Sequence, residues 1–544
     1  MISRLLKLNG GVHPPEHKLE STSRGIAAVP LAQTLVLPLR QHVGNLPKIL
    51  VQPGEHVLKG QQLAEAVGSI SAAVHAPTSG VIVSIEDQLI PHPSGLPDVS
   101  ITLKADGEDR WMERKPVDWR NTERLQLVAG LRESGIVGMG GAAFPTQIKL
   151  RPGGGSGIKT LIINGAECEP YITCDDVLMR ERADEIVKGI VIANYILAPE
   201  RIIVGIEDNK PEAVQAMREA CAKSDVRMDV IVVPTLYPSG DARRLAAILT
   251  GIEVPSDKRS SDAGLQVFNV ATMMALYRYL ELGETVVSRI VTVTGNVARP
   301  GNFEVPLGTP MGTLLEAAGG TLPNTNELIM GGPMMGFSLP SNDVPVIKAT
   351  NCIIAGAPLL FPAPPPALAC IRCARCAEAC PVSLQPQELY WFAKSQNLEK
   401  AREYNLFDCI ECGCCSYVCP SNIPLVQYYR FAKSEIIAQD KAKEAANLAR
   451  ERNEFRLSRI EREKQERAAK HAQRAAGAKA ENAGDTSDAD EAKKVAIAAA
   501  MERAKAQKEE APPKNTDNIS ETAQAEIAAI DARRAEQKNA EQEN

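Results

Sequence analysis

The sequence lacks the features of several large classes of protein. Aromatic residues make up only 4% of the 544 residues, and Lys+Arg (61) do not outnumber Asp+Glu (67), which leaves a net charge of −6. Without an excess of positive charge, the chain has no overall field that attracts a polyanion, so nucleic-acid binding is not expected. The hydrophobic fraction of 44% and charged fraction of 24% are those of ordinary globular protein and exclude a fully disordered or multi-span membrane chain.

Neither a membrane span nor an export signal is predicted. The uncharged stretch from Cys352 to Ile371 is long enough to cross a membrane, but it contains five prolines, which a spanning helix could not accommodate together. We interpret this stretch as an apolar linker. The first residues, MISRLLKLNGG, hold no apolar core long enough for a secretory signal before two glycines interrupt them, so we expect a cytoplasmic protein.

Thirteen cysteines in a chain without an export signal argue against a disulfide framework. Eight of them fall in two short motifs, which indicates metal or redox chemistry. The other five are Cys168, Cys174, Cys221, Cys352 and Cys414.

At roughly 100–200 residues per domain, the length predicts three to five domains. Residues 31–105 alternate short Val, Ile and Leu runs with turn signals and predict a small β domain. Its segments PGEHVLKGQ and SGVIVSIE resemble those of biotinyl and lipoyl carrier domains, which have a barrel-sandwich fold. The stretch from Gly68 to Ser71, where those domains present a modified lysine, contains no lysine, so we expect a structural domain and not a carrier.

The remaining chain predicts a multidomain α+β protein. Apolar β-branched runs alternate with helical patterns over 106–287, which favours an α/β domain with a parallel or mixed sheet. Residues 288–345 return to strand and turn signals and predict a small β-grasp-like (SLBB-type) domain. The other predicted parts are an N-terminal arm (1–30), a helical segment with the cysteine motifs (346–435) and a charged helical or disordered tail (436–544). The last 104 residues hold 28 Ala and equal numbers of basic and acidic residues, 21 each, so a solvated helix or disorder is favoured over a partner-docking helix.

Both cysteine motifs read C-x₂-C-x₂-C-x₃-C-P. In two-cluster ferredoxins, three cysteines spaced in this way hold three corners of a 4Fe–4S cluster, and the fourth ligates the neighbouring cluster. The pattern therefore predicts two clusters whose ligands are exchanged between the motifs. The first set is Cys370, Cys373, Cys376 and Cys419; the second is Cys409, Cys412, Cys415 and Cys380.

Structural zinc is the alternative for these motifs. Zinc sites usually gather two C-x₂-C pairs around one ion, whereas three evenly spaced cysteines within seven residues suit a four-metal cluster better. Cys414 lies beside Cys415, but only Cys415 preserves the spacing of the first motif. Cys414 and the four scattered cysteines are interpreted as non-ligands, and the scattered ones as small buried apolar residues.

A glycine-rich loop, GMGGAAFP from Gly138 to Pro145, is the candidate place for an electron donor to bind. Glycines let backbone N–H groups approach a phosphate or ring closely. The loop lacks the Gly-Lys-Ser/Thr of a Walker loop and the G-x-G-x-x-G spacing of a Rossmann turn, so alone it is a weak signal. NGAECEPY follows the next strand directly, at the kind of strand end where α/β sheets place ligands.

These segments, together with YPSGD and NVAT farther on, resemble the NADH-binding flavoprotein subunit of respiratory complex I, whose motifs read GRGGAGFP, NADESEP and NNVET. With the β domain before them and the two cysteine motifs after, their order over residues 1–435 is similar to the RnfC (RsxC) family of the Rnf (Rsx) ion-translocating electron-transport complexes.

The resemblance implies non-covalent FMN and NAD(H) as ligands and assigns residues to them. Gly138, Gly140, Gly141 and Lys149 would approach FMN, with Lys149 near its phosphate; Asn164 and Asn269 would bond the flavin and Thr272 its phosphate end. Glu167 and Glu169 would shape the nicotinamide pocket, and Phe144 or Tyr237 could stack on a cofactor ring. Each of these residues could instead be a turn former or a satisfied core polar group. In the complex I motifs, an aspartate stands at Ala166, and Arg and Gly stand at Met139 and Ala143, so this chain lacks one hydrogen-bond acceptor for the flavin and one cation in the loop.

The predicted function is electron input. NADH would reduce bound FMN, and single electrons would pass through two 4Fe–4S clusters to other subunits of an Rnf/Rsx membrane complex. The resemblance implies a peripheral position on the cytoplasmic side of the inner membrane. The alternatives are an electron-transfer subunit of a soluble NAD-linked dehydrogenase and a ferredoxin-bearing scaffold without a flavin. No acid–base catalytic residue is expected, because hydride transfer depends on positioning.

Overall fold

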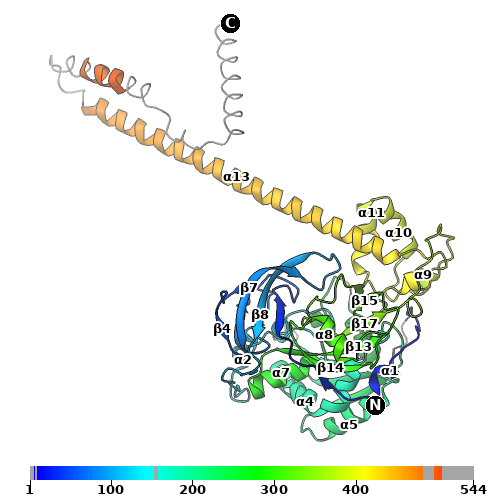
Figure 1. Cartoon of the computed structure of the whole chain (residues 1–544). Coiled ribbons are helices and arrows are strands. Elements are labelled where there is room, and N and C mark those ends of the chain that lie inside the picture. Colours follow the sequence, from blue (N-terminus) through cyan, green and yellow to red (C-terminus); the bar gives the residue numbers. More distant parts are fainter. Residues whose placement is uncertain (1–4, 7–8, 152–156, 256, 482–494, 505–544) are drawn as a thin grey trace. The chain divides into compact units, whose positions relative to one another are not determined.

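The computed structural model describes residues 5–6, 9–151, 157–255, 257–481 and 495–504. Contacts divide the chain into one unit, Met1–Asp440, and a second, Lys441–Asn544. Within the first unit, a β domain, an α/β domain, a mixed sheet and a helical segment follow one another along the chain (Figure 1).

Two antiparallel sheets form the β domain. Leu35 and Leu37 alternate with more exposed neighbours along β2 and are fully buried, as expected for a strand with one face on the core. The segment from Gly68 to Ser71 lies between β5 and β6. The larger sheet has the order β2 (Thr34–Pro38), β8 (Pro97–Ala105), β7 (Gly80–Leu89), β4 (His56–Val57), and the smaller one β3 (Lys48–Ile49), β5 (Gln62–Glu65), β6 (Val74–His75).

The α/β domain is built on a four-stranded parallel sheet covered on both faces. The strand order is β11 (Asp229–Val233), β10 (Arg201–Glu207), β9 (Thr160–Gly165), β12 (Leu265–Asn269). Leu161 and Ile163 of β9 pack in the same core as α4 (Cys174–Leu197), α5 (Pro211–Ala222) and α7 (Val270–Leu282). Ile162 packs in the core of α6 (Ala242–Thr250). Burial on both faces explains the uninterrupted apolar runs of these strands.

The third part is a six-stranded mixed sheet with helix α8 (Met311–Ala317). Its order is β1 (Ala27–Ala28), β14 (Gly301–Pro306), β13 (Ser288–Gly295), β17 (Cys352–Gly356), β15 (Glu327–Met330), β16 (Phe337–Ser338). Two predictions are wrong here. The domain does not end at residue 345, and the uncharged stretch begins as strand β17 and not as a linker, because β17 pairs with both β13 and β15. The N-terminal arm, which also forms helix α1 (Leu19–Thr22), contributes β1 to this sheet.

Short helices surround the cysteine motifs in the last part of the first unit. Their shared core contains Leu389, Leu406 and Tyr429. The helices are α9 (Arg375–Glu378), α10 (Pro386–Lys394), α11 (Leu398–Glu403), α12 (Cys414–Tyr417) and the beginning of α13 (Leu425–Glu481).

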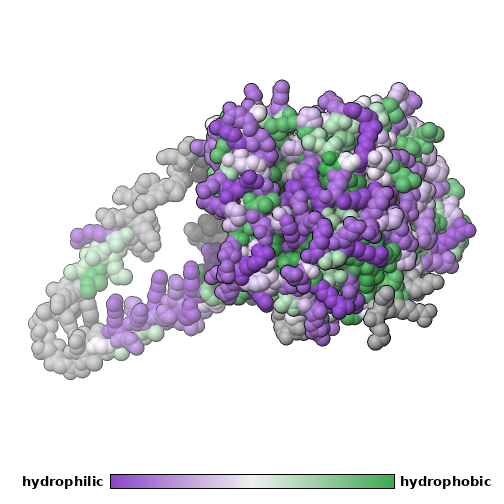
Figure 2. Space-filling view, turned by 90° about the horizontal axis from the view of Figure 1, so that it is seen from below, coloured by the Kyte–Doolittle hydropathy of each residue, from purple (hydrophilic) through white to green (hydrophobic). Residues whose placement is uncertain are grey.

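In the second unit, α13 continues from Lys441 to Glu481. Between 441 and 477 its side chains are exposed, Leu448, Phe455 and Leu457 among them, except for Ile460, which is half-buried. This stretch is therefore helical, one of the two forms predicted for the tail. The rest of the predicted tail lies outside the described residues, except for 495–504. Among the helices of the described ranges, none has the length and apolarity of a membrane span. On the face shown in Figure 2, hydrophilic residues predominate and hydrophobic ones occur in small groups.

Candidate functional site

The polar ends of two neighbouring strands form the base of the candidate flavin site. Asn164 is the last residue but one of β9, and it follows the apolar run of that strand. Asn269 is the last residue of β12 and pairs with Asn164 in the parallel register. Asn164 donates from Nδ2 to the carbonyl of Gly240 (2.9 Å) and accepts the N–H of Ala166. Asn269 caps α7 by accepting the N–H of Ala271 at 2.9 Å. The two predicted asparagines are therefore side by side, at the edge where parallel sheets bind ligands.

The glycine-rich loop lies over the start of α7. The N–H of Met139 donates to Oγ1 of Thr272 at 3.0 Å, and a Cβ added to Gly140 would lie 3.4 Å from Asn269. Gly141 has a φ of +108°, which a residue with a side chain rarely adopts, and nothing lies near its missing Cβ. The structure thus brings the loop, Thr272 and Asn269 together, as predicted, and it leaves room beside Gly141 for close approach of a ligand.

Lys149 ends the short helix α3 (Thr146–Lys149) that follows the loop. Its Nζ donates to the carbonyl of Val267 and lies 4.8 Å from the centre of the Phe268 ring. Burial lowers the pKa of Lys149 to about 8. Phe144, between the glycines and α3, is half-buried, and its carbonyl accepts the N–H of Gly138 at 2.7 Å.

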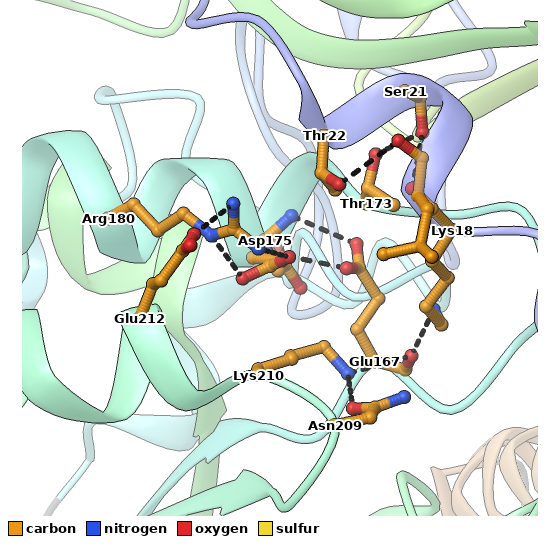
Figure 3. A network of polar contacts seen from close by, with 12 residues as sticks. Lys18, Ser21, Thr22, Glu167, Thr173, Asp175, Arg180, Asn209, Lys210 and Glu212 are labelled. Carbon is orange, nitrogen blue, oxygen red and sulfur yellow. Dashed lines mark hydrogen bonds and ion pairs between the residues drawn. The ribbon is translucent and has the colours of Figure 1, made fainter.

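Glu167 is held in a network of polar contacts at the start of α4 (Figure 3). Its carboxylate accepts the backbone N–H groups of Asp175 (2.9 Å) and Asp176 (3.3 Å), and its carbonyl accepts Nζ of Lys18 at 2.6 Å. Lys210, which is also buried in this region, forms an ion pair with Glu207 at 2.6 Å. Both carboxylate oxygens of Glu167 therefore satisfy helix N–H groups that otherwise lack partners.

Glu169 joins the α/β domain to the mixed sheet. Oε1 accepts the N–H groups of Met334 (2.7 Å) and Met335 (3.1 Å), and a Cβ at Gly332 would overlap its side chain. Burial raises the pKa of Glu169, and these two N–H hydrogen bonds act in the opposite direction. The carboxylate thus holds the loop from Gly331 to Gly336 (GGPMMG) against the candidate site.

A cavity opens beside the glycine-rich loop, and its five charged lining residues, two of which contact the predicted site, gave no signal in the sequence. It measures about 590 Å³, including space open to solvent, and Met139, Asp175 and Arg289 line it. Asp175 accepts Nδ2 of Asn269 at 2.5 Å, and burial raises its pKa to about 7. Arg289, only 3% exposed, donates to the carbonyls of Met139 (2.9 Å) and Thr350 (3.3 Å). Thus a cation from the mixed sheet fixes the loop at the position where complex I has an arginine.

These residues fit FMN. A loop with an open glycine, the start of a 13-residue helix and a nearby buried ammonium are groups that bind a phosphate. The paired asparagines at the strand ends supply amide donors and acceptors for a polar ring.

Three side chains near this site, two of them described above, are poorly suited to hold a metal ion. Ligand atoms of Glu167, Cys174 and Asp175 lie within 4.8 Å of one another. However, the Glu167 oxygens already accept N–H groups, and burial raises the pKa values of Cys174 and Asp175, which disfavours the anionic forms that bind metal.

The eight motif cysteines line two cavities. Four cysteines line each one, and each cavity takes three from one motif and the last from the other. Cys380, Cys409, Cys412 and Cys415 line the first, which we call the inner cavity, and Cys370, Cys373, Cys376 and Cys419 line the second, the outer cavity. Two sets of four thiols suit iron–sulfur clusters, whose ligands are cysteine thiolates.

The remaining cysteines do not line either cavity. Cys414 is fully buried, and its Sγ lies 4.0 Å from the carbonyl of Tyr237. Cys174, Cys221 and Cys352 are buried, as predicted. Cys168 is only half-buried and accepts the N–H of Gly240 at 3.2 Å, so its interpretation as a purely apolar residue is wrong.

The inner cavity adjoins the flavin-type domain. Tyr237 is 2% exposed, and its hydroxyl donates to the carbonyl of Cys412 at 2.6 Å. The N–H of Gly11 donates to the carbonyl of Ala379, and Val12 pairs with Tyr237. Tyr237, predicted to face a cofactor ring, is therefore directed toward the second cysteine motif.

Four family models match this chain. They are the RnfC barrel sandwich hybrid domain over residues 6–108, the Nuo51 FMN-binding domain over 131–278, the SLBB domain over 290–338 and a 4Fe–4S dicluster domain over 366–423. The fold and the site therefore define a multidomain flavin and iron–sulfur redox protein, with FMN and 4Fe–4S clusters as its cofactors. The predicted fold class is confirmed.

Curated relatives agree with this class. The ion-translocating oxidoreductase complex C subunit of Haemophilus influenzae (strain ATCC 51907 / DSM 11121 / KW20 / Rd) is 48% identical over 407 residues, which cover 74% of this chain and 50% of that protein. The protein of the same name from Yersinia pestis bv. Antiqua (strain Antiqua) is 47% identical and covered to 65%. The chain belongs to this family, the RnfC family, although it spans only half to about two thirds of these relatives.

Among solved structures, an NAD+-reducing NiFe hydrogenase in the H2-reduced state is weakly similar. The TM-score is 0.41 at 16% identity, over 57% of this chain and 61% of that one.

Proposed function

We propose that this chain is the electron-input subunit of an ion-translocating oxidoreductase of the Rnf/Rsx type. It passes electrons between NAD(H), bound FMN and two 4Fe–4S clusters to partner subunits. The observation that carries the proposal is the direct contact, within one compact unit, between a flavin-type α/β domain and a cavity lined by four cysteines.

The flavin is held by the loop and strand ends. Gly138, Gly140 and Gly141 let the backbone approach the flavin closely. Lys149 and Thr272 bind its phosphate end. Asn164 and Asn269 form hydrogen bonds with its ring. Phe144 stacks on a cofactor ring. The arrangement that supports this assignment is the packing of the loop on the start of α7, with Arg289 fixing the Met139 carbonyl behind it.

Glu169 and Glu167 shape the nicotinamide pocket. Glu169 does so by anchoring the loop at Met334, and Glu167 by holding the start of α4. No side chain is needed to move a proton at the reacting carbon, since hydride transfer depends on stacking and on exclusion of water. Met139 and Ala143, which are 4% and 5% exposed, are apolar parts of the loop that exclude water.

The cysteines are the cluster ligands. Cys380, Cys409, Cys412 and Cys415 hold one cluster in the inner cavity, and Cys370, Cys373, Cys376 and Cys419 hold the other in the outer cavity. FMN supplies the conversion between two-electron and one-electron transfer. The inner cavity faces the flavin domain, and Cys373 in the outer cavity is exposed, so the outer cluster is the exit to a partner.

The proposed location is the cytoplasmic face of the inner membrane, peripherally attached to the membrane subunits of the complex. The support is the family membership together with the finding that no described helix could span a membrane.

Two experiments test this function. Anaerobically purified protein should reduce ferricyanide with NADH only when FMN is present; activity without flavin, or none with it, would contradict the proposal. In wild-type cells the protein should sediment with washed membranes and be released by chaotrope or high pH without detergent. Recovery entirely in the cytosol would favour the soluble dehydrogenase alternative.

A further inference from the structure

Arg244 is a buried cation between the flavin domain and the cysteine motifs. It lies at the start of α6 and is 5% exposed. Nη1 donates to the carbonyls of Asn9 and Pro381, both at 2.9 Å, and Nη2 to that of Gly10 at 3.3 Å. Nε has no partner among the described residues.

The guanidinium has no carboxylate partner within the described part of the chain. The nearest candidate, Asp241, uses its carboxylate to accept the backbone N–H groups of Arg243 and Arg244 at the start of α6. Burying a charge is costly unless it is paired. Asp241 acts on Arg244 only through its charge and without an ion pair, so a stable Arg244 needs more negative charge than the acidic side chains of the described ranges supply.

One of the segments that Arg244 holds, at Pro381, forms part of the wall of the inner cavity, and the other, at Asn9 and Gly10, packs against that wall. Pro381 directly follows Cys380, and a Cβ on Gly10 would lie 2.4 Å from the carbonyl of Cys380. Tyr237, seven residues before Arg244, donates to Cys412 on the same side. A cluster with four thiolate ligands carries net negative charge, so the inner cavity would supply the counter-charge that Arg244 lacks.

We propose that Arg244 is the counter-charge of the inner cluster and raises the reduction potential of that cluster above its value without the guanidinium. This inference rests on the proposed function, because it assigns a cluster to the inner cavity. Reduction adds one electron, and thus one negative charge, to the cluster. A buried cation stabilises the reduced form more than the oxidised form and does so strongly because water does not screen it.

Two other cations near the cysteines are placed differently. Arg372 lines the outer cavity but is exposed, so solvent screens its charge. Lys433 donates to the carbonyl of Cys409 but is paired with Glu411 at 2.8 Å. Arg244 is therefore the residue expected to make the two potentials differ.

The test is a dithionite titration of the anaerobic, cofactor-loaded chain, followed by EPR. Cys373→Ser removes an outer ligand and assigns the signals, since the cluster that persists is the inner one. Arg244→Gln should lower the reduction constant of the inner cluster about tenfold, equal to about 59 mV for one electron, and leave the outer one unchanged. Arg244→Lys keeps the charge and should stay within about threefold of the wild type.

Arg289→Gln is the matched control, because Arg289 is also a buried guanidinium bonded only to carbonyls, but at the glycine-rich loop. It should leave both cluster potentials unchanged. If Arg244→Gln leaves the inner potential unaltered, or shifts both clusters equally, the proposal is wrong. If Arg244→Gln does not retain the inner cluster, the test rests on Arg244→Lys. Because this variant keeps the charge, a tenfold fall in the reduction constant of its inner cluster would exclude a charge effect. Dithionite reduces the clusters without NADH or flavin. Failure of the Arg244 proposal can therefore be distinguished from failure of the proposed NADH oxidation.

Discussion

Several side chains that the sequence assigns to cofactors also hold the backbone of the site together. Lys149 donates to the Val267 carbonyl, Thr272 accepts the loop N–H of Met139, and Glu167 accepts two N–H groups of α4. Substitutions at these residues will therefore affect both folding and binding, and a useful experiment must separate the two effects.

Lys149 should make FMN binding depend on pH. Its pKa is lowered to about 8 by burial, so the ammonium is charged below this value and loses its charge as pH rises through it. The phosphate, with a second pKa near 6, is fully ionised throughout this range. We expect FMN affinity to fall several-fold between pH 7 and 9, measured by flavin fluorescence on the flavin-free chain.

Two variants at this position separate charge from shape. Lys149→Gln should bind FMN about tenfold more weakly, with no pH dependence, and Lys149→Arg should also lose the pH dependence but retain affinity. An unaltered pH dependence in Lys149→Gln would show that another group titrates.

Glu167→Gln should destabilise the protein, because an amide presents only one oxygen to the two N–H groups at the start of α4. We expect a loss of about 1–2 kcal/mol, measured by thermal unfolding under anaerobic conditions. Glu212→Gln is the control, since Glu212 pairs with Arg180 but is 70% exposed, and it should change stability by less than about 0.5 kcal/mol. Equal losses in both variants would refute the role of Glu167 in α4.

Cys414 and Cys415 are adjacent but should behave oppositely. Cys415 lines the inner cavity, whereas Cys414 contacts the carbonyl of Tyr237. Cys415→Ala should retain about four of eight irons per chain, and Cys414→Ala all eight, by iron and sulfide analysis. If only Cys414→Ala loses four irons, Cys414 and not Cys415 is the ligand in the second motif.

The cysteines are the part of the site for which local sequence spacing is most informative. Three ligands of one cluster come from one short loop, and the fourth comes from a fixed position in the other motif. Arg244 and Arg289 gave no such signal. Arg244 meets Pro381 from 137 positions away, and Arg289 meets Met139 from 150 positions away. Contacts of this kind follow from domain packing, which the pattern of a single segment does not encode.

Among the elements, helices α4 and α7 pack closely and together position the candidate flavin site. A Cβ on Gly189 of α4 would lie 1.9 Å from the carbonyl of Met273 in α7. Asp175 at the start of α4 and Thr272 at the start of α7 both depend on this contact for their placement.

Gly189→Ala should therefore force the two helices apart, at a cost of about 1–3 kcal/mol or more, and weaken FMN retention. Gly130→Ala is a matched control within helix α2 (Arg124–Gly130), where a Cβ meets nothing within 4 Å. It should be neutral or slightly stabilising. The measurements are thermal unfolding and flavin content after gel filtration; equal stability of the two variants would contradict the packing.

The sequence predicted the parallel strands and their helices well, because long apolar runs alternate there with helical periodicity. It failed at β17, whose five residues are all buried. A short strand covered on both faces shows no alternation of polar and apolar residues, and the prolines that follow it suggested a linker.

Across the molecule, the first unit joins a flavin-type domain to two cysteine cavities through Tyr237, Arg244 and the N-terminal arm around Gly11. These contacts lie between the inner cavity and the α/β domain. Under the proposed function, electrons that enter at the flavin would therefore reach the inner cavity first and would leave from the outer one, where Cys373 is exposed.

The most direct test of this account is to add NADH to the anaerobically purified chain and combine iron, sulfide and FMN analysis with EPR. The account predicts about eight irons and one FMN per chain, and signals from two interacting 4Fe–4S clusters after NADH is added. A colourless protein that contains zinc or no metal, or clusters that dithionite reduces but NADH does not reduce even with FMN bound, would contradict it.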